Sequence, residues 1–428
     1  MSLISITQAK DYRFNSNSSQ GFNPQVQAGV SDIIHQVISG GDQALRDFTA
    51  KFDGVQLQNL LVPHSEIERA EQQITPETRE ILEGAIGNIQ AFHTKQLQKS
   101  WKHEEADGTI LGETVTPLDR VGLYVPGGKA FYPSTLIMNA VPALLAGVPE
   151  VAVVSPPGAN GLPHQLVLGL CGMLGITEIY AVGGAQAVAA LAYGTESIKP
   201  VTKITGPGNM WVTEAKRQVF GKVGIDSIAG PSEILILHDD PAIDPEYLVR
   251  DMLSQAEHDE EAAAILVTTS DKAAKAVQAR LDEIVPTLPR TEIIIPSLKN
   301  HGMIIVAETI EEGIEICNQI APEHLEVLFA DMSKFDLIRN AGAVFVGQYS
   351  SEPVGDYYAG PNHTIPTSGA ARYAGPLSAR DFQKHSSYIE YSKERLLAEG
   401  EKIAKFADME ELNAHATAIR VRLEKENG

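Results

Sequence analysis

Apolar residues recur along this chain with two different spacings, and each spacing predicts a different kind of element. From residue 23 to about residue 98 they recur three and four positions apart, as at Ile33, Ile34 and Val37. This spacing is typical of amphipathic helices. The polar stretch before it, residues 1–22, is predicted to form an N-terminal helical arm.

From Thr114 onward, short apolar runs alternate with Gly/Pro turns and helical stretches. The segments PEVAVVSPP, EIYAVGGAQAVAAL and VTKITGPGNMWVTEAKRQVF form a first series. A second series contains SEILILHDD, AAAILVTTS, GMIIVAET, HLEVLFA and AGAVFVG. Repeated strand–helix units predict parallel sheets with helices on their faces, so the two series predict an α/β protein with two similar domains.

The strand pattern ends at about Leu377, and the rest of the chain is predicted to form two short helices. Their apolar stripe of Leu412, Ile419 and Leu423 is too thin to make a core, so we expect this tail to dock on another surface, such as a partner subunit. His415 lies beside the stripe, and the pattern alone favours a buried core or interface histidine. Glu410 and Glu411 are expected at the start of the last helix, where carboxylates also favour the helix dipole.

The charge balance and cysteine content exclude several classes of protein. With 34 basic and 55 acidic residues the net charge is −21, which argues against nucleic acid and anionic membranes as partners. The two cysteines, Cys171 and Cys317, leave no disulfide framework and no thiolate metal cluster, and they favour the cytoplasm. The sequence also lacks a signal peptide pattern and any run of 18 apolar residues. The charged positions Lys216–Arg217 and Glu257–Glu261 are predicted to be solvated.

Three Gly-rich turns follow predicted strands, at Tyr124–Gly128, Gly183–Gln186 and Gly206–Asn209. Glycine lets the backbone approach a phosphate closely, and the following helix start favours negative charge. None completes a standard dinucleotide or P-loop fingerprint, although Asp226 lies where a ribose-binding acid is expected. Each turn alone is equally well explained by close strand–helix packing. Together they favour a ligand crevice.

Metal ligation has to come from His, Asp, Glu and Gln. Gln255 and His258 lie three residues apart, which places both on one face of a helix end, although a solvated helix end is the more frequent explanation. Asp356 and His363 lie in a Gly/Pro-rich loop, GDYYAGPNH, of the kind that carries function.

The pair Glu323 and His324 places a carboxylate beside an imidazole, two groups that exchange protons near neutral pH. In a regular strand their side chains point to opposite faces, so joint action requires irregular backbone at Pro322. Ordinary surface charge is the alternative.

These segments are also where the chain resembles a known family. VGLYVPGGKAFYPSTLIMNAVPALLAGV, KITGPGN, AGPSEILIL, SQAEHD, APEHLE and GDYYAGPNHTIPTSGAARY strongly resemble histidinol dehydrogenase, and the similarity runs from about residue 25 to 420. That family oxidises L-histidinol through L-histidinaldehyde to L-histidine, reduces two NAD⁺ and holds one Zn²⁺ per site. Lys129 departs from the small polar residue expected at its position.

The resemblance assigns roles to individual residues. The implied zinc ligands are Gln255, His258, Asp356 and His415. The implied proton-transfer residues are Glu323 and His324. Our own expectation is that His324 takes the alcohol and diol protons and that Glu323 activates the attacking water. Besides the zinc ligands, the implied substrate contacts are Ser232, His324, His363 and Glu410, with Glu411 as a competitor for Glu410. The implied NAD⁺ contacts are Tyr124, Gln186 and Asn209.

The resemblance also implies two incomplete Rossmann-like domains, each a doubly wound parallel sheet, with helical extensions. The expected divisions are an arm (1–22), a discontinuous catalytic α/β domain (23–123 and 235–376), an NAD-binding α/β domain (124–234) and a helical dimerisation segment (377–428). Family members form intertwined homodimers in which the C-terminal segment completes the partner's site. A zinc hydrolase with Glu323 as base and a non-catalytic two-lobed binding protein are the alternatives.

Overall fold

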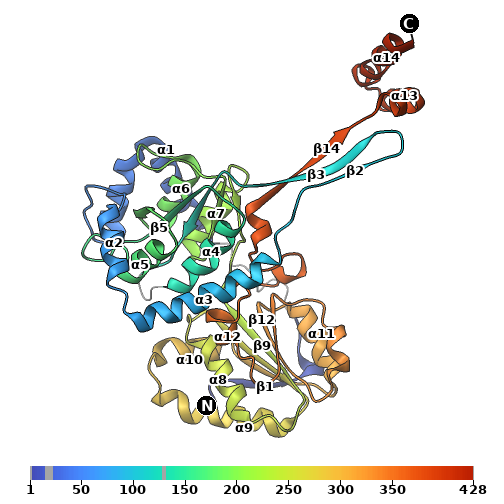
Figure 1. Ribbon diagram of the computed structural model, residues 1–428. Helices are drawn as coiled ribbons and strands as arrows, with labels where there is room; N and C mark the ends of the chain where they lie inside the picture. Colours follow the sequence, from blue (N-terminus) through green and yellow to red (C-terminus); the bar gives the residue numbers. More distant parts are fainter. Residues whose placement is uncertain (1, 15–22, 128–131, 428) are drawn as a thin grey trace. The chain divides into compact units, whose positions relative to one another are not determined.

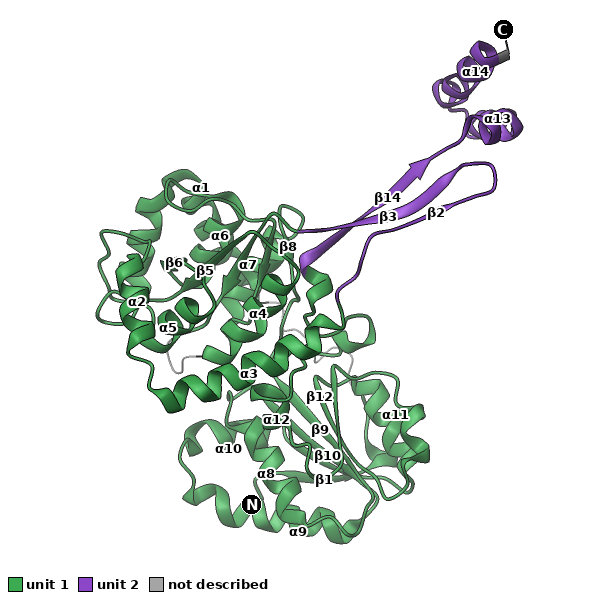
Figure 2. Cartoon of the chain, in the orientation of Figure 1, with its two compact units in different colours: residues 1–96, 118–381 green, residues 97–117, 382–428 purple. Residues whose placement is uncertain are grey.

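The computed structural model describes residues 2–14, 23–127 and 132–427 (Figure 1). The chain divides into two compact units (Figure 2). Unit 1 comprises Met1–Gln96 and Leu118–Asp381, and unit 2 comprises Leu97–Pro117 and Phe382–Gly428. Within the described ranges, none of the helices combines the length and the apolar character needed to cross a bilayer.

The first sheet of unit 1 has five parallel strands in the order β6-β5-β4-β7-β8. The strands are β4 (Arg120–Tyr124), β5 (Glu150–Ser155), β6 (Glu178–Ala181), β7 (Lys203–Thr205) and β8 (Gly224–Ile225). The helices that connect them are α4 (Pro133–Leu145), α5 (Gln165–Met173), α6 (Gly184–Tyr193) and α7 (Met210–Val219). The strand order reverses at β4, which places a switch point between the carboxyl ends of β4 and β7, where open α/β sheets bind ligands.

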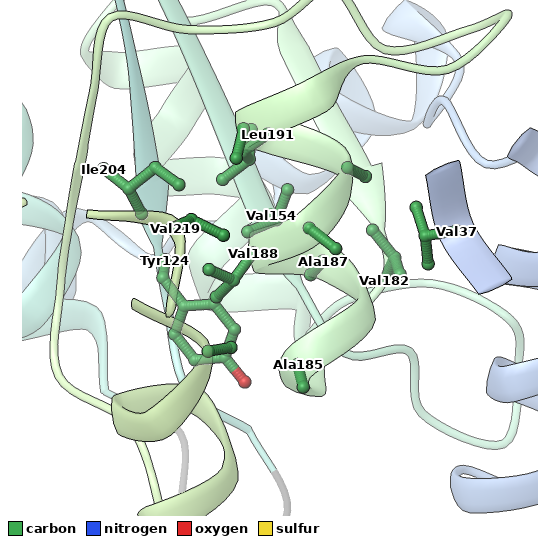
Figure 3. Close-up of a cluster of buried hydrophobic side chains, with 14 of the residues drawn as sticks. Val37, Tyr124, Val154, Val182, Ala185, Ala187, Val188, Leu191, Ile204 and Val219 are labelled. Carbon is green, nitrogen blue, oxygen red and sulfur yellow. The ribbon is translucent and has the colours of Figure 1, made fainter. Parts of the chain in front are cut away.

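The N-terminal helices cover this first sheet. They are α1 (Pro24–Phe52), α2 (His64–Gln72) and α3 (Pro76–Thr94), which confirms the helical pattern of this region. α1 packs on α6 and α7, and its Val37 joins Val188 and Leu191 in one buried cluster (Figure 3). The expected grouping of residues 23–123 with 235–376 stays a prediction, because an amphipathic stripe does not specify which sheet it covers and Asn88 of α3 also donates to the carbonyl oxygen of Tyr358.

The second sheet of unit 1 has six parallel strands in the order β1-β11-β10-β9-β12-β13. Its strands are β1 (Ser5–Gln8), β9 (Glu233–His238), β10 (Ala263–Thr268), β11 (Met303–Val306), β12 (His324–Leu328) and β13 (Ala343–Val346). Its helices are α8 (Pro245–Ala256), α9 (Asp271–Ile284), α10 (Thr291–Asn300), α11 (Ile310–Ile320) and α12 (Glu352–Tyr357). Apart from β1, the order repeats that of the first sheet, and the predicted pair of Rossmann-like sheets is confirmed.

The expectation of a helical arm at the N-terminus is wrong for residues 5–8, which form the strand β1. Its four residues, SITQ, pair in parallel with β11 at the edge of the second sheet. A strand of this length shows too little alternation to be recognised from sequence, and a short 3-10 turn at Ala9–Asp11 follows it. Further 3-10 turns lie at Val285–Thr287, Met332–Leu337, Ala370–Arg372 and Ala379–Phe382.

Unit 2 contains an antiparallel sheet that sequence reasoning missed. Its strands are β2 (Trp101–Glu104), β3 (Ile110–Pro117) and β14 (Gln383–Glu390), in the order β14-β3-β2. The strand pattern therefore does not end at Leu377, but QKHSSYIE in β14 is mostly exposed and shows no apolar alternation. The predicted helical tail is confirmed as α13 (Lys393–Met409) and α14 (Asn413–Asn427), which pack on each other.

Candidate active site

Glu323 and His324 lie at the amino end of β12, where the backbone is irregular. His324 is the first residue of the strand, and Ala321, two residues before Glu323, has a left-handed φ of 54°. Both side chains are buried, and Glu323 Oε2 lies 3.6 Å from His324 Nδ1. The irregular backbone expected at Pro322 is confirmed, and the surface-charge alternative is wrong.

The main chain of Glu233, at the start of β9, contacts both members of this pair. Its N–H donates to Glu323 Oε2 at 3.0 Å, and its carbonyl oxygen lies 3.1 Å from His324 Nδ1. A carbonyl oxygen can only accept, so Nδ1 carries the proton and Nε2 is the free acceptor of the neutral ring. Nε2 is buried without a hydrogen-bond partner and lies 3.8 Å from Asp356 Oδ1.

Burial shifts the two groups in opposite directions. It lowers the pKa of His324, which favours the neutral imidazole. It raises the pKa of Glu323 well above its ordinary value, and repulsion from Glu233 adds to that rise. The side chain of Ser232 hydrogen-bonds to Glu323 and opposes the shift. The pair therefore combines a free nitrogen acceptor with an unusually basic carboxylate, as proton transfer near neutral pH requires.

Three of the four implied metal ligands belong to unit 1. Gln255 lies in the last turn of α8, is fully buried, and has both amide atoms without a hydrogen-bond partner. His258 follows the end of that helix, and Asp356 belongs to α12 rather than to the loop that the sequence predicted. His258, Asp356 and Glu352 each offer one atom, and these atoms lie within 4.8 Å of one another.

The polar atoms around this cluster fit a divalent cation. Burial raises the pKa of Asp356, and the neighbouring Glu352 raises it further. A cation would relieve the repulsion between these carboxyl groups and would satisfy the buried amide of Gln255. Nitrogen and oxygen donors of this kind suit Zn²⁺.

Glu352 was missed by the sequence analysis, because a carboxylate in the first turn of a helix looks like an ordinary dipole partner. The structure buries it and surrounds it with polar contacts. Its backbone N–H donates to Glu326 Oε1 at 2.9 Å, and Ser254 Oγ donates to its Oε2 at 3.2 Å. Glu326 in turn hydrogen-bonds to Asp251, and burial raises the pKa of both of these carboxyl groups. These buried acids support the start of α12 and hence the position of Asp356.

His363 lies in the loop after α12 and faces the same cluster. Its Nε2 is buried without a hydrogen-bond partner, and the ring hydrogen-bonds to the backbone of Ser134. Burial lowers the pKa of His363 to about 4, and repulsion from His324 and His258 adds to this shift. A neutral imidazole with one free nitrogen is suited to a polar substrate.

The three Gly-rich turns meet at the carboxyl ends of β4, β6 and β7. The Tyr124 hydroxyl accepts a hydrogen bond from Gly184 N at 3.0 Å, and Gln186 is buried in the first turn of α6. A Cβ on Gly206 would lie 2.1 Å from the carbonyl oxygen of Tyr124, so the third turn rests directly on the first. The side chain of Asn209 caps α7, because it accepts hydrogen bonds from the backbone N–H groups of Trp211 and Val212. The expected crevice residues are therefore neighbours, and Lys129 lies outside the described residues.

Two charged residues near these turns differ from expectation. The Lys216 side chain is only 3% exposed and forms an ion pair with Asp226, which is equally buried. Lys216 is therefore not solvated, and Asp226 is engaged by the protein itself, so it is not free for a ribose. Arg217 is half-buried and pairs with Glu214, whereas most of Glu257–Glu261 is exposed, as predicted.

Glu410, Glu411 and His415 belong to unit 2. Glu410 follows the last residue of α13 as its C-cap, and Glu411 comes next with a φ of 60°, so neither begins the last helix as expected. His415 lies in the first turn of α14 and is exposed, as is Leu412, which the sequence placed in a buried stripe. The cluster in unit 1 is formed without these residues.

Comparison with known proteins supplies the identity that the geometry alone leaves open. A sequence model described as histidinol dehydrogenase matches residues 16–423. This chain belongs to the histidinol dehydrogenase family. It is 53% identical over 397 residues to the histidinol dehydrogenase of Geobacillus kaustophilus, covering 92% of this chain and 93% of the relative. The Halalkalibacterium halodurans enzyme is also 53% identical, with 94% of each chain covered.

A solved structure agrees over the whole length. The crystal structure of histidinol dehydrogenase from Elizabethkingia anophelis has a TM-score of 0.92 and 33% identity, and all of both chains is covered. Membership of the histidinol dehydrogenase family favours a dehydrogenase over the two alternatives, a zinc hydrolase and a non-catalytic binding protein.

Proposed function

We propose that this protein oxidises L-histidinol through L-histidinaldehyde to L-histidine in the cytoplasm, as the final steps of histidine biosynthesis. Two NAD⁺ accept the hydrides in turn. The observation that carries this proposal is the buried Glu323–His324 pair, which lies beside Asp356 of the His258–Glu352–Asp356 cluster. The amide of Gln255, a fourth metal-type donor, has no hydrogen-bond partner. A dehydrogenase of this kind needs a base near the carbinol and a fixed point to orient the substrate.

Gln255, His258 and Asp356 would hold one Zn²⁺ per site, and His415 from the C-terminal segment of a second subunit would complete the set. When bound, the ion supplies positive charge that orients the substrate. Ser232, His363 and Glu410 are the remaining substrate contacts, and the carboxylate of Glu410 would neutralise the substrate ammonium group. Family membership and the unsatisfied amide of Gln255 support this assignment.

His324 acts on the alcohol. Its free Nε2 takes the hydroxyl proton while hydride leaves the carbinol carbon for NAD⁺, giving the aldehyde, NADH and a proton on the imidazole. The imidazole then releases this proton to solvent. After water has added to the aldehyde, the same nitrogen takes a proton from the diol as the second hydride leaves for a second NAD⁺. The buried, neutral state of His324 supports both roles.

Glu323 acts on water. Its basic carboxylate removes a proton from the water molecule whose oxygen attacks the aldehyde carbon. The raised pKa of Glu323 supports this role, because a stronger base removes a water proton more readily. Tyr124, Gln186 and Asn209, which the Gly-rich turns bring together, are the proposed NAD⁺ contacts.

The test is NADH absorbance after histidinol and NAD⁺ are mixed with the enzyme, with histidine measured in the same samples. We expect two NADH for each histidine, and we expect chelation of the metal to abolish turnover. The His324→Asn variant is the matched control for background reduction. Absence of NADH would favour a hydrolase or a binding protein, and full activity without metal would contradict the zinc assignment.

A further inference from the structure

A buried ion pair lies directly beneath the turn Gly206–Asn209. Lys216 comes from the inner face of α7, and Asp226 follows β8. Both side chains are 3% exposed, and the other buried residues of α7 are Val212, Ala215 and Val219. Removing two charges from water is costly, and an apolar pair of similar volume often serves stability equally well. The location of the pair therefore needs a reason other than stability.

The ion pair holds one residue of the turn from both sides. Lys216 Nζ donates to the carbonyl oxygen of Gly206 at 3.0 Å, and Gly206 N–H donates to Asp226 Oδ2 at 2.7 Å. The other carboxylate oxygen of Asp226 accepts from Ser227 N at 2.7 Å. Both backbone polar groups of Gly206 are thus fixed by charged side chains, which make stronger hydrogen bonds than neutral ones.

Gly206 lies against Tyr124 and begins the turn that ends at Asn209, so it is close to two of the three residues assigned to NAD⁺. Its φ of 119° is accessible to glycine, and a Cβ there would lie 2.1 Å from the carbonyl oxygen of Tyr124. Three residues later, Asn209 starts α7. A shift of Gly206 would therefore move Asn209 relative to Tyr124, while Glu323 and His324 lie on a different sheet.

We propose that Lys216 and Asp226 are positioning residues for the dinucleotide. Their ion pair holds the Gly206–Asn209 turn in the conformation that binds NAD⁺, so that it determines the affinity for NAD⁺ and not the affinity for histidinol. This inference rests on the proposed function of the three turns as the NAD⁺ site.

The principal test compares Lys216→Met with Arg217→Met. The first change removes the fully buried cation, whereas the second removes a half-buried neighbouring cation that pairs with Glu214 on the same helix. For Lys216→Met we expect the KM for NAD⁺ to rise about tenfold or more, with little change in the KM for histidinol or in kcat. Arg217→Met should match the wild type in all three constants.

A binding measurement separates this effect from catalysis. The chain has two tryptophans, so Trp101→Phe leaves Trp211, two residues from Asn209, as the reporter of NAD⁺ titrations. We expect the Kd for NAD⁺ to rise in Lys216→Met by the same factor as the KM. If Lys216→Met does not fold, Asp226→Asn serves in its place, because it keeps an oxygen acceptor but removes the charge.

Two results would overturn the proposal. One is an unchanged NAD⁺ affinity in a variant that folds. The other is a general defect, in which kcat falls, the KM values for NAD⁺ and histidinol rise by the same factor, and Tm is lower. The fluorescence titration does not depend on turnover. A wild-type enzyme that binds NAD⁺ but fails to oxidise histidinol would therefore count against the proposed reaction, and the positioning role would still be tested.

Discussion

The two buried residues proposed for proton transfer differ in the atoms that can accept a proton, and this difference allows their proposed roles to be tested separately. His324 offers one free nitrogen, because its Nδ1 is committed to the carbonyl oxygen of Glu233. Glu323 offers a carboxylate made more basic by burial. The first is suited to the alcohol and diol protons, and the second to the water that attacks the aldehyde.

Replacing each residue alone should therefore give different defects. His324→Asn should slow both oxidations by about 10²- to 10⁴-fold, the usual contribution of a positioned base. Glu323→Gln keeps the size and one acceptor oxygen, so the alcohol step should be spared and aldehyde oxidation slowed by a similar factor. Single-turnover NADH formation, started from histidinol or from histidinaldehyde, measures the steps separately. Equal losses in both steps for Glu323→Gln would contradict this division of labour.

A buried histidine outside the active site predicts how stability depends on pH. His238 lies at the end of β9 with Nδ1 2.9 Å from Thr268 Oγ1, and burial lowers the pKa of His238. The unfolded chain therefore binds a proton at a higher pH than the folded protein does. Stability is lost as pH falls from about 6.5 towards the lower folded-state pKa, at up to about 1.4 kcal/mol per pH unit.

The matched comparison is His238→Gln against His35→Gln, which changes an exposed histidine. Urea unfolding at pH 7.5 and 5.5 gives the loss of stability for each protein. His238→Gln should lose less stability on acidification than the wild type, and His35→Gln should lose the same amount. An unaltered pH dependence in His238→Gln would show that another group controls it.

At the residue scale, the sequence identified candidate acids, bases and ligands more reliably than it identified which charged side chains are buried. The Glu323–His324 pair and the Gln255–His258 spacing were visible because both residues of each pair are close in the chain. Glu352 and Lys216 were not recognised. Their burial depends on contacts with Glu326 and Asp226, and a charged residue looks solvated until such partners are known.

At the scale of elements, the contact between β12 and β13 fixes the backbone of Glu323. Gly342 precedes β13, and a Cβ there would lie 2.2 Å from Ile365 Cγ2 and 2.6 Å from the carbonyl oxygen of Glu323. Ala343 N donates to that same oxygen at 2.9 Å. The close approach of these two segments therefore requires glycine.

Gly342→Ala should destabilise the protein by about 1–3 kcal/mol, as overpacking of a close contact usually does, and should also lower activity because Glu323 is displaced. Gly375→Ala is the matched control, because a Cβ at Gly375 meets no atom within 4 Å. Thermal unfolding and turnover are measured on both. If Gly342→Ala had the Tm and turnover of the wild type, the close contact between β12 and β13 would not be needed for stability or for activity.

The predicted elements were correct where burial imposes a pattern. β9 to β12 are largely buried strands and were visible as apolar runs, whereas β2, β3 and β14 are mostly exposed or half-buried and were missed. The N-terminal helices were recognised, but not the sheet that they cover. Periodicity identifies a buried face, and only tertiary packing identifies what lies against it.

At the scale of the whole molecule, the proposed sharing of His415 between subunits makes two inactive variants complementary. His324→Asn removes the proposed base and His415→Asn removes a proposed ligand, so each homodimer should be inactive. A heterodimer of the two contains one site with both defects and one intact site. Random reassociation should restore roughly a quarter of wild-type activity.

The mixture is denatured and refolded together, and NADH formation is compared with that of each variant refolded alone. Recovery should require joint refolding, because exchange of subunits is needed. No recovery, in a mixture shown to contain heterodimers, would mean that His415 acts within its own subunit.

The position of β1 has a consequence for synthesis of the chain. β1 at residues 5–8 pairs with β11 at residues 303–306, so its partner is translated about 300 residues later. At usual rates of synthesis this first strand remains on the nascent chain for roughly 15–60 s before the sheet can close. An unpaired strand invites association with other chains during that interval. The yield of folded enzyme should therefore be sensitive to what is fused to its N-terminus and to how well nascent chains are protected by chaperones.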